Sequence, residues 1–79
     1  METAFVLISC EVGISDAVTK KLQFIDEVKD AISMWGSFDV VAKVTASTRE
    51  KLRDVIRKKI RTTDNIRTTM SLMVTENQT

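Results

Sequence analysis

The stretch that decides the fold is Trp35-Gly36-Ser37-Phe38-Asp39, which leads directly into Val40-Val41-Ala42-Lys43-Val44. The second segment is the most β-prone part of the chain, because β-branched side chains fit a pleated strand. Gly36 is one of only two glycines, and it stands where a tight reversal needs a residue that tolerates a positive φ. We therefore predict a turn at this glycine and a strand over residues 38–46.

Asp39 has two interpretations at the end of this turn. Its carboxylate lies beside flexible backbone and could contact a small ligand, or it could simply cap the turn that Gly36 makes. Side chains alternate along a strand, so Asp39 shares a face with Val41, Lys43 and Thr45. The opposite face carries Phe38, Val40, Ala42 and Val44.

The residues before the turn fit two different structures. A helix begins at Ser15-Asp16, where a serine caps and an acid occupies the first turn. Apolar residues at helical spacing from Val18 to Ile32 would allow this helix to continue to Met34. Alternatively, the helix ends near residues 24–26, and residues 28–35 form a strand that pairs across the turn. Periodicity slightly favours the first structure, and the turn favours the second.

The first strand is predicted over residues 4–12 and is apolar on both faces. Phe5 and Leu7 lie on one face, and Val6, Ile8, Cys10 and Val12 lie on the other. Both faces should therefore be covered. Helices can cover one of them, and the other is most simply covered by the sheet of a second copy of the chain.

The second half of the chain repeats the pattern of helix and strand. Ser47-Thr48-Arg49-Glu50 has the spacing of a capping box, and the polar residues 62–65 end the helix. The helix buries an apolar stripe of Leu52, Val55, Ile56 and Ile60. A last strand is predicted over residues 66–75, with Ile66, Thr68, Met70, Leu72 and Val74 on one face and Arg67, Thr69, Ser71 and Met73 on the other. Residues 76–79 are expected to fray.

This order predicts an α+β fold of the ferredoxin-like type, βαββαβ, in one domain over residues 1–79. An antiparallel four-stranded sheet carries two helices on one face. A chain of 79 residues has a small core, and Cys10, the only cysteine, cannot form an intrachain disulfide. We therefore expect oligomerisation to stabilise the fold.

Composition also limits the chemistry that we expect. The chain has no histidine, and its carboxylates lack metal-ligand spacing, so we expect neither a metal nor a cofactor. No basic signal-peptide segment precedes the apolar run at residues 4–8, and that run is too short to span a membrane. Together with the lone Cys10 these features predict a soluble cytoplasmic protein.

The chain resembles the effector-binding domain of the Lrp/AsnC (feast/famine) transcription regulators, also called the regulation-of-amino-acid-metabolism (RAM) domain. The resemblance rests on the apolar first strand, on Gly36-x-x-Asp39 before the β-prone run, on the capped second helix, and on Ile66-x-x-Thr69-x-Ser71-Leu72. It spans roughly residues 4 to 75 and implies that residues 28–35 are the second strand. It also implies a domain without the N-terminal helix-turn-helix of full-length members, and therefore without specific DNA binding of its own.

The resemblance further implies how such a domain works. Members dimerise sheet to sheet, and their dimers often assemble into rings of four. Effectors, usually amino acids, bind between dimers near the glycine–aspartate hairpin. Carried over to this chain, the ligand-binding residues are Trp35, Gly36, Ser37, Asp39, Thr69 and Ser71.

Three of these residues keep a second interpretation. Trp35 stands where the family usually has a small hydroxyl residue, so its indole either lines the pocket or is buried in an interface. Thr69 and Ser71 either face the ligand or pack across strands. The expected partners are an amino-acid effector, further copies of the chain, and full-length Lrp/AsnC regulators. No membrane partner is expected.

Other functions compete with effector binding. Residues 49–67 carry eight basic and three acidic residues, a net charge of +5, which raises the question of nucleic-acid binding. No aromatic residue interrupts this segment, so stacking on single strands is not supported, and a solvated helix face explains the charge more simply. An enzyme is disfavoured because the chain has no histidine or tyrosine and its cysteine lies within a strand. A pure assembly role with full-length regulators remains the serious alternative.

Overall fold

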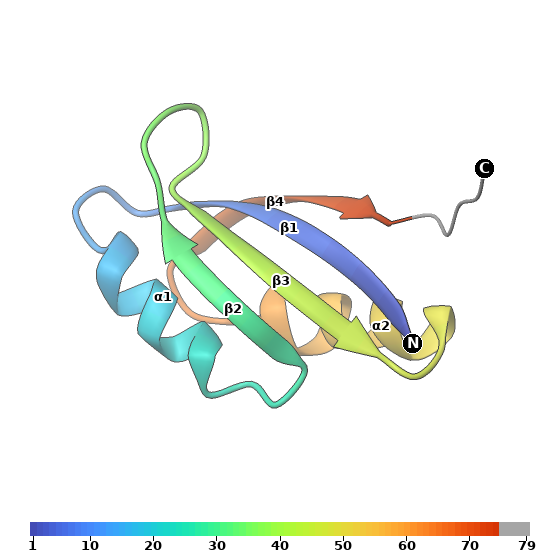
Figure 1. Cartoon of the computed structure of the whole chain (residues 1–79). Helices are drawn as coiled ribbons and strands as arrows, with labels where there is room; N and C mark the ends of the chain where they lie inside the picture. The colour runs from blue at the N-terminus through green and yellow to red at the C-terminus, as the bar shows by residue number, and fades with distance from the viewer. Residues whose placement is uncertain (75–79) are drawn as a thin grey trace.

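The structure, a computed structural model, describes residues 1–74 and contains one antiparallel sheet and two helical segments (Figure 1). The strands lie in the order β2-β3-β1-β4, and both helical segments cover the same face. This confirms the ferredoxin-like fold and shows that a strand, and not a continued helix, precedes the turn. The elements are β1 (Glu2–Cys10), α1 (Ser15–Gln23), β2 (Val28–Ser33), β3 (Val40–Ala46), α2 (Arg49–Val55), its continuation η1 (Ile56–Ile60) and β4 (Ile66–Met73).

The core lies between the sheet and the helices, and β1 runs through its centre. On one side β1 pairs with β3, from Glu2 opposite Ala46 to Ile8 opposite Val40. On the other side it pairs with β4, beginning with Ala4 opposite Met73. Alternation then buries one face of β1 and of β3, whereas no residue of the edge strand β4 is buried. The fully buried side chains of the sheet and helices are Ala4, Val6, Ile8, Val18, Leu22, Val40, Ala42, Val44, Leu52 and Ile60.

No element among residues 1–74 forms a layer over the opposite face of the sheet. Large apolar side chains lie on it and are partly exposed: Phe5, Leu7, Ile32, Val41, Met70 and Leu72. Phe5, Ile32, Met70 and Leu72 expose between 38% and 53% of their surface. We call these six residues the open sheet face.

The N-cap residues of both helices differ from the predicted ones. Ile14, not Ser15, occupies the N-cap position of α1, and it makes no side-chain cap. Asp16 is instead bound to the sheet, because its Oδ1 accepts a hydrogen bond of 3.0 Å from the Ser33 hydroxyl. In α2 the cap is Thr48, whose hydroxyl accepts a hydrogen bond of 3.1 Å from the Lys51 amide. The predicted Ser47–Glu50 capping box is therefore wrong, since β3 extends to Ala46 and Ser47 forms the bend that follows it.

The apolar stripe of the second helix is confirmed, because Leu52, Val55, Ile56 and Ile60 are all buried. The conformation of its backbone was not predicted from the sequence. The helix widens at η1, where the Arg61 amide donates to the Ile56 carbonyl five residues earlier at 2.9 Å.

Strand ends also differ from the alternating pattern. β1 ends at Cys10, so Val12 lies in the following turn with 92% of its surface exposed, and its predicted place on the buried face is wrong. β3 begins at Val40, which leaves Phe38 and Asp39 in the hairpin loop. The fraying expected of residues 76–79 concerns a part of the chain outside the described residues.

One ion pair joins the second helical segment to the loop before β2. The Lys59 ammonium lies 3.0 Å from Glu27 Oε1. Its hydrogen bond is the main reason that the pKa of Glu27 is lowered from its usual value. The pair is partly exposed, so it contributes about 1 kcal/mol at most.

In residues 1–74, none of the helices has the length and the apolar composition that crossing a lipid bilayer requires.

The position of the helix cap gives a direct test of the fold. Thr48→Ala should lower the free energy of unfolding by about 1 kcal/mol, because the Lys51 amide loses its acceptor. Ser47→Ala is the matched control and should leave the stability within about 0.5 kcal/mol. Urea unfolding followed by circular dichroism measures both. A larger loss for Ser47→Ala than for Thr48→Ala would contradict the cap assigned to Thr48.

Candidate functional site

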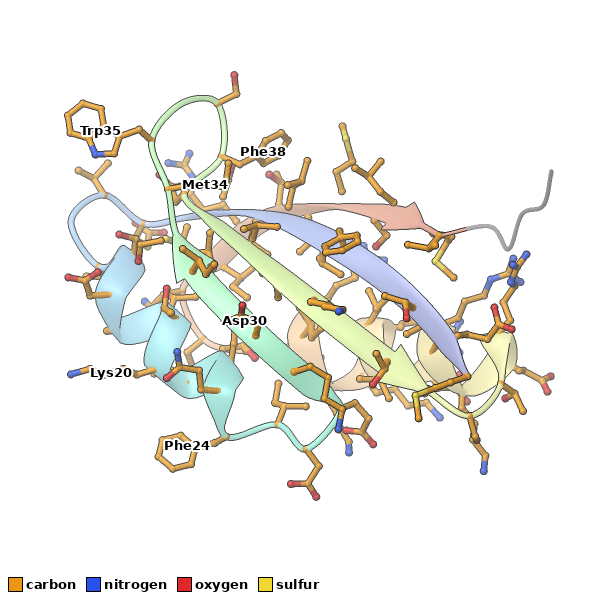
Figure 2. The ribbon with its side chains drawn as sticks, viewed as in Figure 1. Lys20, Phe24, Asp30, Met34, Trp35 and Phe38 are labelled. Carbon is orange, nitrogen blue, oxygen red and sulfur yellow. The ribbon has the colours of Figure 1, made fainter. Side chains whose placement is uncertain are left out.

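The loop between β2 and β3 forms a hairpin that rises beyond the end of the sheet (Figure 1). Its base closes where the Met34 amide donates to the Asp39 carbonyl at 2.9 Å. Gly36 has a φ of 122°, a conformation that side-chain-bearing residues rarely adopt, so the predicted role of this glycine is confirmed. Trp35 projects from the loop away from the sheet, and 98% of its surface is exposed (Figure 2).

Asp39 connects this hairpin to the end of β1 through two hydrogen bonds. Its amide donates to the Ile8 carbonyl at 2.8 Å, and its Oδ2 accepts from the Cys10 amide at 2.9 Å. A carboxylate that accepts from a backbone amide makes a strong, charge-assisted hydrogen bond. This bond uses Oδ2 and leaves Oδ1 without a backbone partner among residues 1–74. The Asp39 side chain therefore caps the end of β1 and not the turn at Gly36, and its contact with a ligand stays a prediction.

A β-bulge lies beside Asp39, on the other edge of β1. Cys10 is paired with Ile66 and Ser9 with Thr68, so Arg67 is an extra residue between two pairs. The bulge is anchored by the Glu11 amide, which donates to the carbonyl of Asn65 at 3.1 Å. Asn65 adopts a left-handed conformation with a φ of 72°, which asparagine tolerates better than most residues.

These features surround a hollow of about 450 Å³ at the end of the sheet. We call it the hairpin hollow. Its lining residues are Ser9, Cys10, Val12, Gly13, Asp39, Arg67 and Thr68. It therefore contains one carboxylate and one guanidinium, and no ion pair within 4.0 Å joins these two described side chains.

Cys10 contributes backbone and not chemistry to this hollow. Its side chain is buried. Burial, and then the negative charge of Asp39, raises the pKa of the thiol above its usual value. A thiol that stays protonated is a weak nucleophile. No three metal-ligating side chains of the described chain gather into a metal site.

The structure separates the predicted ligand residues into three places. Asp39 lies in the hairpin hollow, whereas Trp35, Gly36 and Ser37 form the exposed part of the hairpin. Thr69 and Ser71 lie opposite Ile8 and Val6, on the face of the sheet that the helices cover. They line a different groove, between β4 and the second helical segment. Their contact with an effector therefore stays a prediction, and this chain alone does not bring them to Asp39.

Two residues of the hairpin hollow were missed by the sequence reasoning. Arg67 was grouped with the basic helix, and Thr68 was placed only by strand alternation. The bulge lies between Ile66 and Thr68, so it changes the alternation for Ile66 and Arg67, whereas Thr68 stays on its predicted face, opposite Ser9. Ile66 consequently packs on the core instead of sharing a face with Met70 and Leu72. A strictly alternating pattern contains no signal for this shift.

Comparisons with known proteins agree with the fold. The family model of the Lrp/AsnC ligand binding domain matches residues 3–78. A hypothetical protein from Pyrococcus horikoshii has a similar structure, with a TM-score of 0.89 and 32% identity over 98% of this chain and 93% of that one. A feast or famine regulatory protein from M. tuberculosis, complexed with L-methionine, has a TM-score of 0.78 and 30% identity over 98% of this chain and 52% of that one.

A curated relative shows the same sequence pattern inside a larger protein. Homocitrate synthase from Saccharolobus islandicus is 29% identical over 72 residues, which is 90% of this chain. The chain spans only about 15% of the length of the curated relatives it matches. The family match over nearly all residues confirms the resemblance seen in the sequence, and the chain belongs to the Lrp/AsnC ligand binding domain family.

The structural bond of Asp39 can be tested separately from any ligand. Asp39→Ala should lower the free energy of unfolding by about 1–3 kcal/mol, because the Cys10 amide loses its acceptor. Asp39→Asn is the matched control, since its amide oxygen can still accept this bond, and it should retain most of the stability. Chemical denaturation of both variants measures the difference. Equal losses in the two variants would show that the negative charge, and not the hydrogen bond, stabilises the hairpin.

Proposed function

We propose that this Lrp/AsnC ligand binding domain binds a free amino acid in the hairpin hollow and assembles through its open sheet face. Family membership supports a regulatory, effector-binding role. The complex of the M. tuberculosis regulator with L-methionine supports an amino acid as the effector class. The small share of homocitrate synthase that matches this chain supports a module that accompanies other activities, with no catalysis of its own.

The proposal depends mainly on one observation, the presence of Asp39 and Arg67 in the same hollow without an ion pair between them. An amino acid carries an ammonium and a carboxylate close together. Asp39 Oδ1 is the acceptor for the ammonium, and the Arg67 guanidinium is a forked donor for the carboxylate. Thr68 adds a hydroxyl, and Val12 is an apolar wall for the ligand's side chain.

The open sheet face supports the assembly part of the proposal. A domain of this size gains little stability from its own core, and a contiguous apolar face commonly marks an interface. We propose that a second copy covers this face, sheet on sheet, in a homodimer. Asp30 lies opposite Lys43 at the margin of the face, so two copies related by a two-fold axis can place these charges against each other.

The hairpins suggest how such dimers associate further. Trp35 is almost fully exposed in each hairpin, and in the sequence it lies close to Asp39, which lines the hairpin hollow. A neighbouring dimer would bury this indole and enclose a ligand, which is the arrangement expected for a tetramer of dimers. The alternative function is assembly with full-length Lrp/AsnC regulators without a ligand, and the open sheet face favours it independently of Asp39.

Amino-acid binding is tested by a thermal-shift screen of the purified protein against the twenty amino acids. At a hundred times the dissociation constant, a ligand adds about 2.7 kcal/mol of stability, which raises the midpoint by roughly 10 °C or more in a chain of this size. Asp39→Asn and Arg67→Gln should each abolish this shift while the proteins stay folded. Lys20→Gln is the control, because Lys20 lies on α1 away from the hollow (Figure 2). A shift that survives both substitutions would exclude this site, and no shift with any amino acid would favour the assembly role.

The interface is tested by charge substitutions on the open sheet face. Leu72→Glu should convert the dimer to a monomer and raise the dissociation constant by about a hundredfold or more, because it buries an unpaired carboxylate at the centre of an apolar contact. Phe24→Glu is the matched control, since Phe24 is an exposed aromatic residue on the loop after α1 (Figure 2). Light scattering coupled to gel filtration measures the mass. A Leu72→Glu protein that keeps the mass of the parent protein would contradict a sheet-to-sheet dimer.

A further inference from the structure

A second concave site lies between the second helical segment and β4. It is a groove of about 400 Å³, lined by Arg53, Ile56, Arg57, Arg61, Thr69, Ser71 and Met73. We call it the arginine groove. It shares no lining residue with the hairpin hollow, although both adjoin β4. The apolar side chains Ile56 and Met73 pack against the core, so the polar groups stand above an apolar floor.

Three guanidinium groups form one row along this groove. Arg53, Arg57 and Arg61 follow each other at intervals of four residues. On an α-helix, such a row gradually turns away from a neighbouring strand, because four residues exceed one turn. The wider turn of η1 reduces this rotation between Arg57 and Arg61, so all three reach the same groove. Wide helical turns of this kind occur frequently at functional sites.

The charge of the row is largely uncompensated. Arg57 pairs with Asp54 at 2.7 Å, but Arg53 and Arg61 form no ion pair within residues 1–74. None of the residues that line the groove is acidic. A row of like charges on one helix repels itself and favours the binding of an anion.

The strand supplies neutral donors on the other side of the groove. Thr69 and Ser71 are two residues apart on β4 and face the helices, as their pairing with Ile8 and Val6 shows. Neither hydroxyl forms a side-chain hydrogen bond within the described part of the chain. The corresponding positions of the other strands carry aliphatic side chains that face the core, whereas Thr69 and Ser71 carry hydroxyls there. They are therefore free to donate to an anion that the arginines hold.

From this arrangement we propose that the arginine groove binds a small ligand with two or three linked phosphates, such as a nucleoside polyphosphate. The planar fork of each arginine matches two oxygens of a phosphate, and the hydroxyls of Thr69 and Ser71 donate to the oxygens that remain. A row of three arginines suits a chain of phosphates better than a single anion. No aromatic residue lines the groove, so the ligand is recognised by its phosphates and not by stacking of its base.

A solvated basic helix face is the competing explanation, and a matched pair of variants distinguishes the two. Sodium tripolyphosphate is the first probe, titrated by calorimetry into the full chain at constant ionic strength. Arg53→Gln/Arg61→Gln should weaken binding by about tenfold or more, since two charge-assisted contacts are lost. Lys51→Gln/Lys58→Gln removes the same charge from the same helical segment but outside the groove, and should change the affinity by less than about twofold.

A third variant tests the groove without changing its charge. Thr69→Val/Ser71→Ala should weaken tripolyphosphate binding several-fold, a result that a diffuse basic surface does not predict. The urea midpoint of each variant shows whether it is folded. Equal weakening in the arginine and lysine pairs, together with no effect of the hydroxyl pair, would overturn the proposal.

Two further probes identify the source of the phosphate. ATP should compete with tripolyphosphate, and ADP should compete more weakly, because the groove holds the ligand by its phosphates. A DNA duplex or an acidic peptide that binds more tightly, and that tripolyphosphate does not displace, would overturn the assignment to a small ligand. Asp39→Asn should leave tripolyphosphate binding unchanged, so this proposal and the amino-acid site can fail independently.

Discussion

The hydrogen bond between the Asp39 carboxylate and the Cys10 amide determines how the functional end of this domain is built. It continues the pairing of β1 and β3 beyond the last regular pair, Ile8 with Val40. β1 lies between β3 and β4, and β4 departs from regular alternation beside this same end of β1, at the bulge opposite Ser9 and Cys10. That bulge carries Arg67 into the hollow beside Asp39. One carboxylate therefore holds the hairpin and brings the opposite charge of the site within reach.

The fold could be predicted because its main determinants are local and periodic. Alternation identified the buried faces of β1 and β3, and helical spacing identified Leu52, Val55, Ile56 and Ile60 as the buried stripe of the second helix. The end of the first helix was ambiguous from periodicity alone, because Val28 and Ile32 suit either a helix or a strand. The turn at Gly36 favoured the strand without deciding it, and the family resemblance assigned residues 28–35 to the second strand. The caps were mispredicted, since the extent of β3 decides whether Ser47 or Thr48 begins the helix.

The candidate site could be predicted only in part, for reasons of register. Asp39 was singled out because a carboxylate follows a glycine turn; its side chain holds the end of β1 through Oδ2, and its contact with a ligand stays a prediction. Arg67 was not found, because a single extra residue in β4 shifts the register at its position, whereas Thr68 keeps the face that alternation gave it. Hydrogen bonds between strands that are far apart in sequence set this register. A hydrophobicity pattern in the sequence does not show this register.

The size of the domain explains why its candidate sites lie at its edges. Two helical segments cover one face of a four-stranded sheet, and the chain has no further element among its described residues to cover the other. β4 is an edge strand, and it adjoins the hairpin hollow through Arg67 and Thr68 and the arginine groove through Thr69 and Ser71. Regular alternation would place Arg67 and Thr69 on the same face of the sheet. The bulge breaks this alternation, which makes the division between the two sites possible. A strand of eight residues thus adjoins both proposed ligand sites, while its apolar residues Met70 and Leu72 lie on the open sheet face. A ligand at either site would therefore contact the same strand that contributes to the proposed interface.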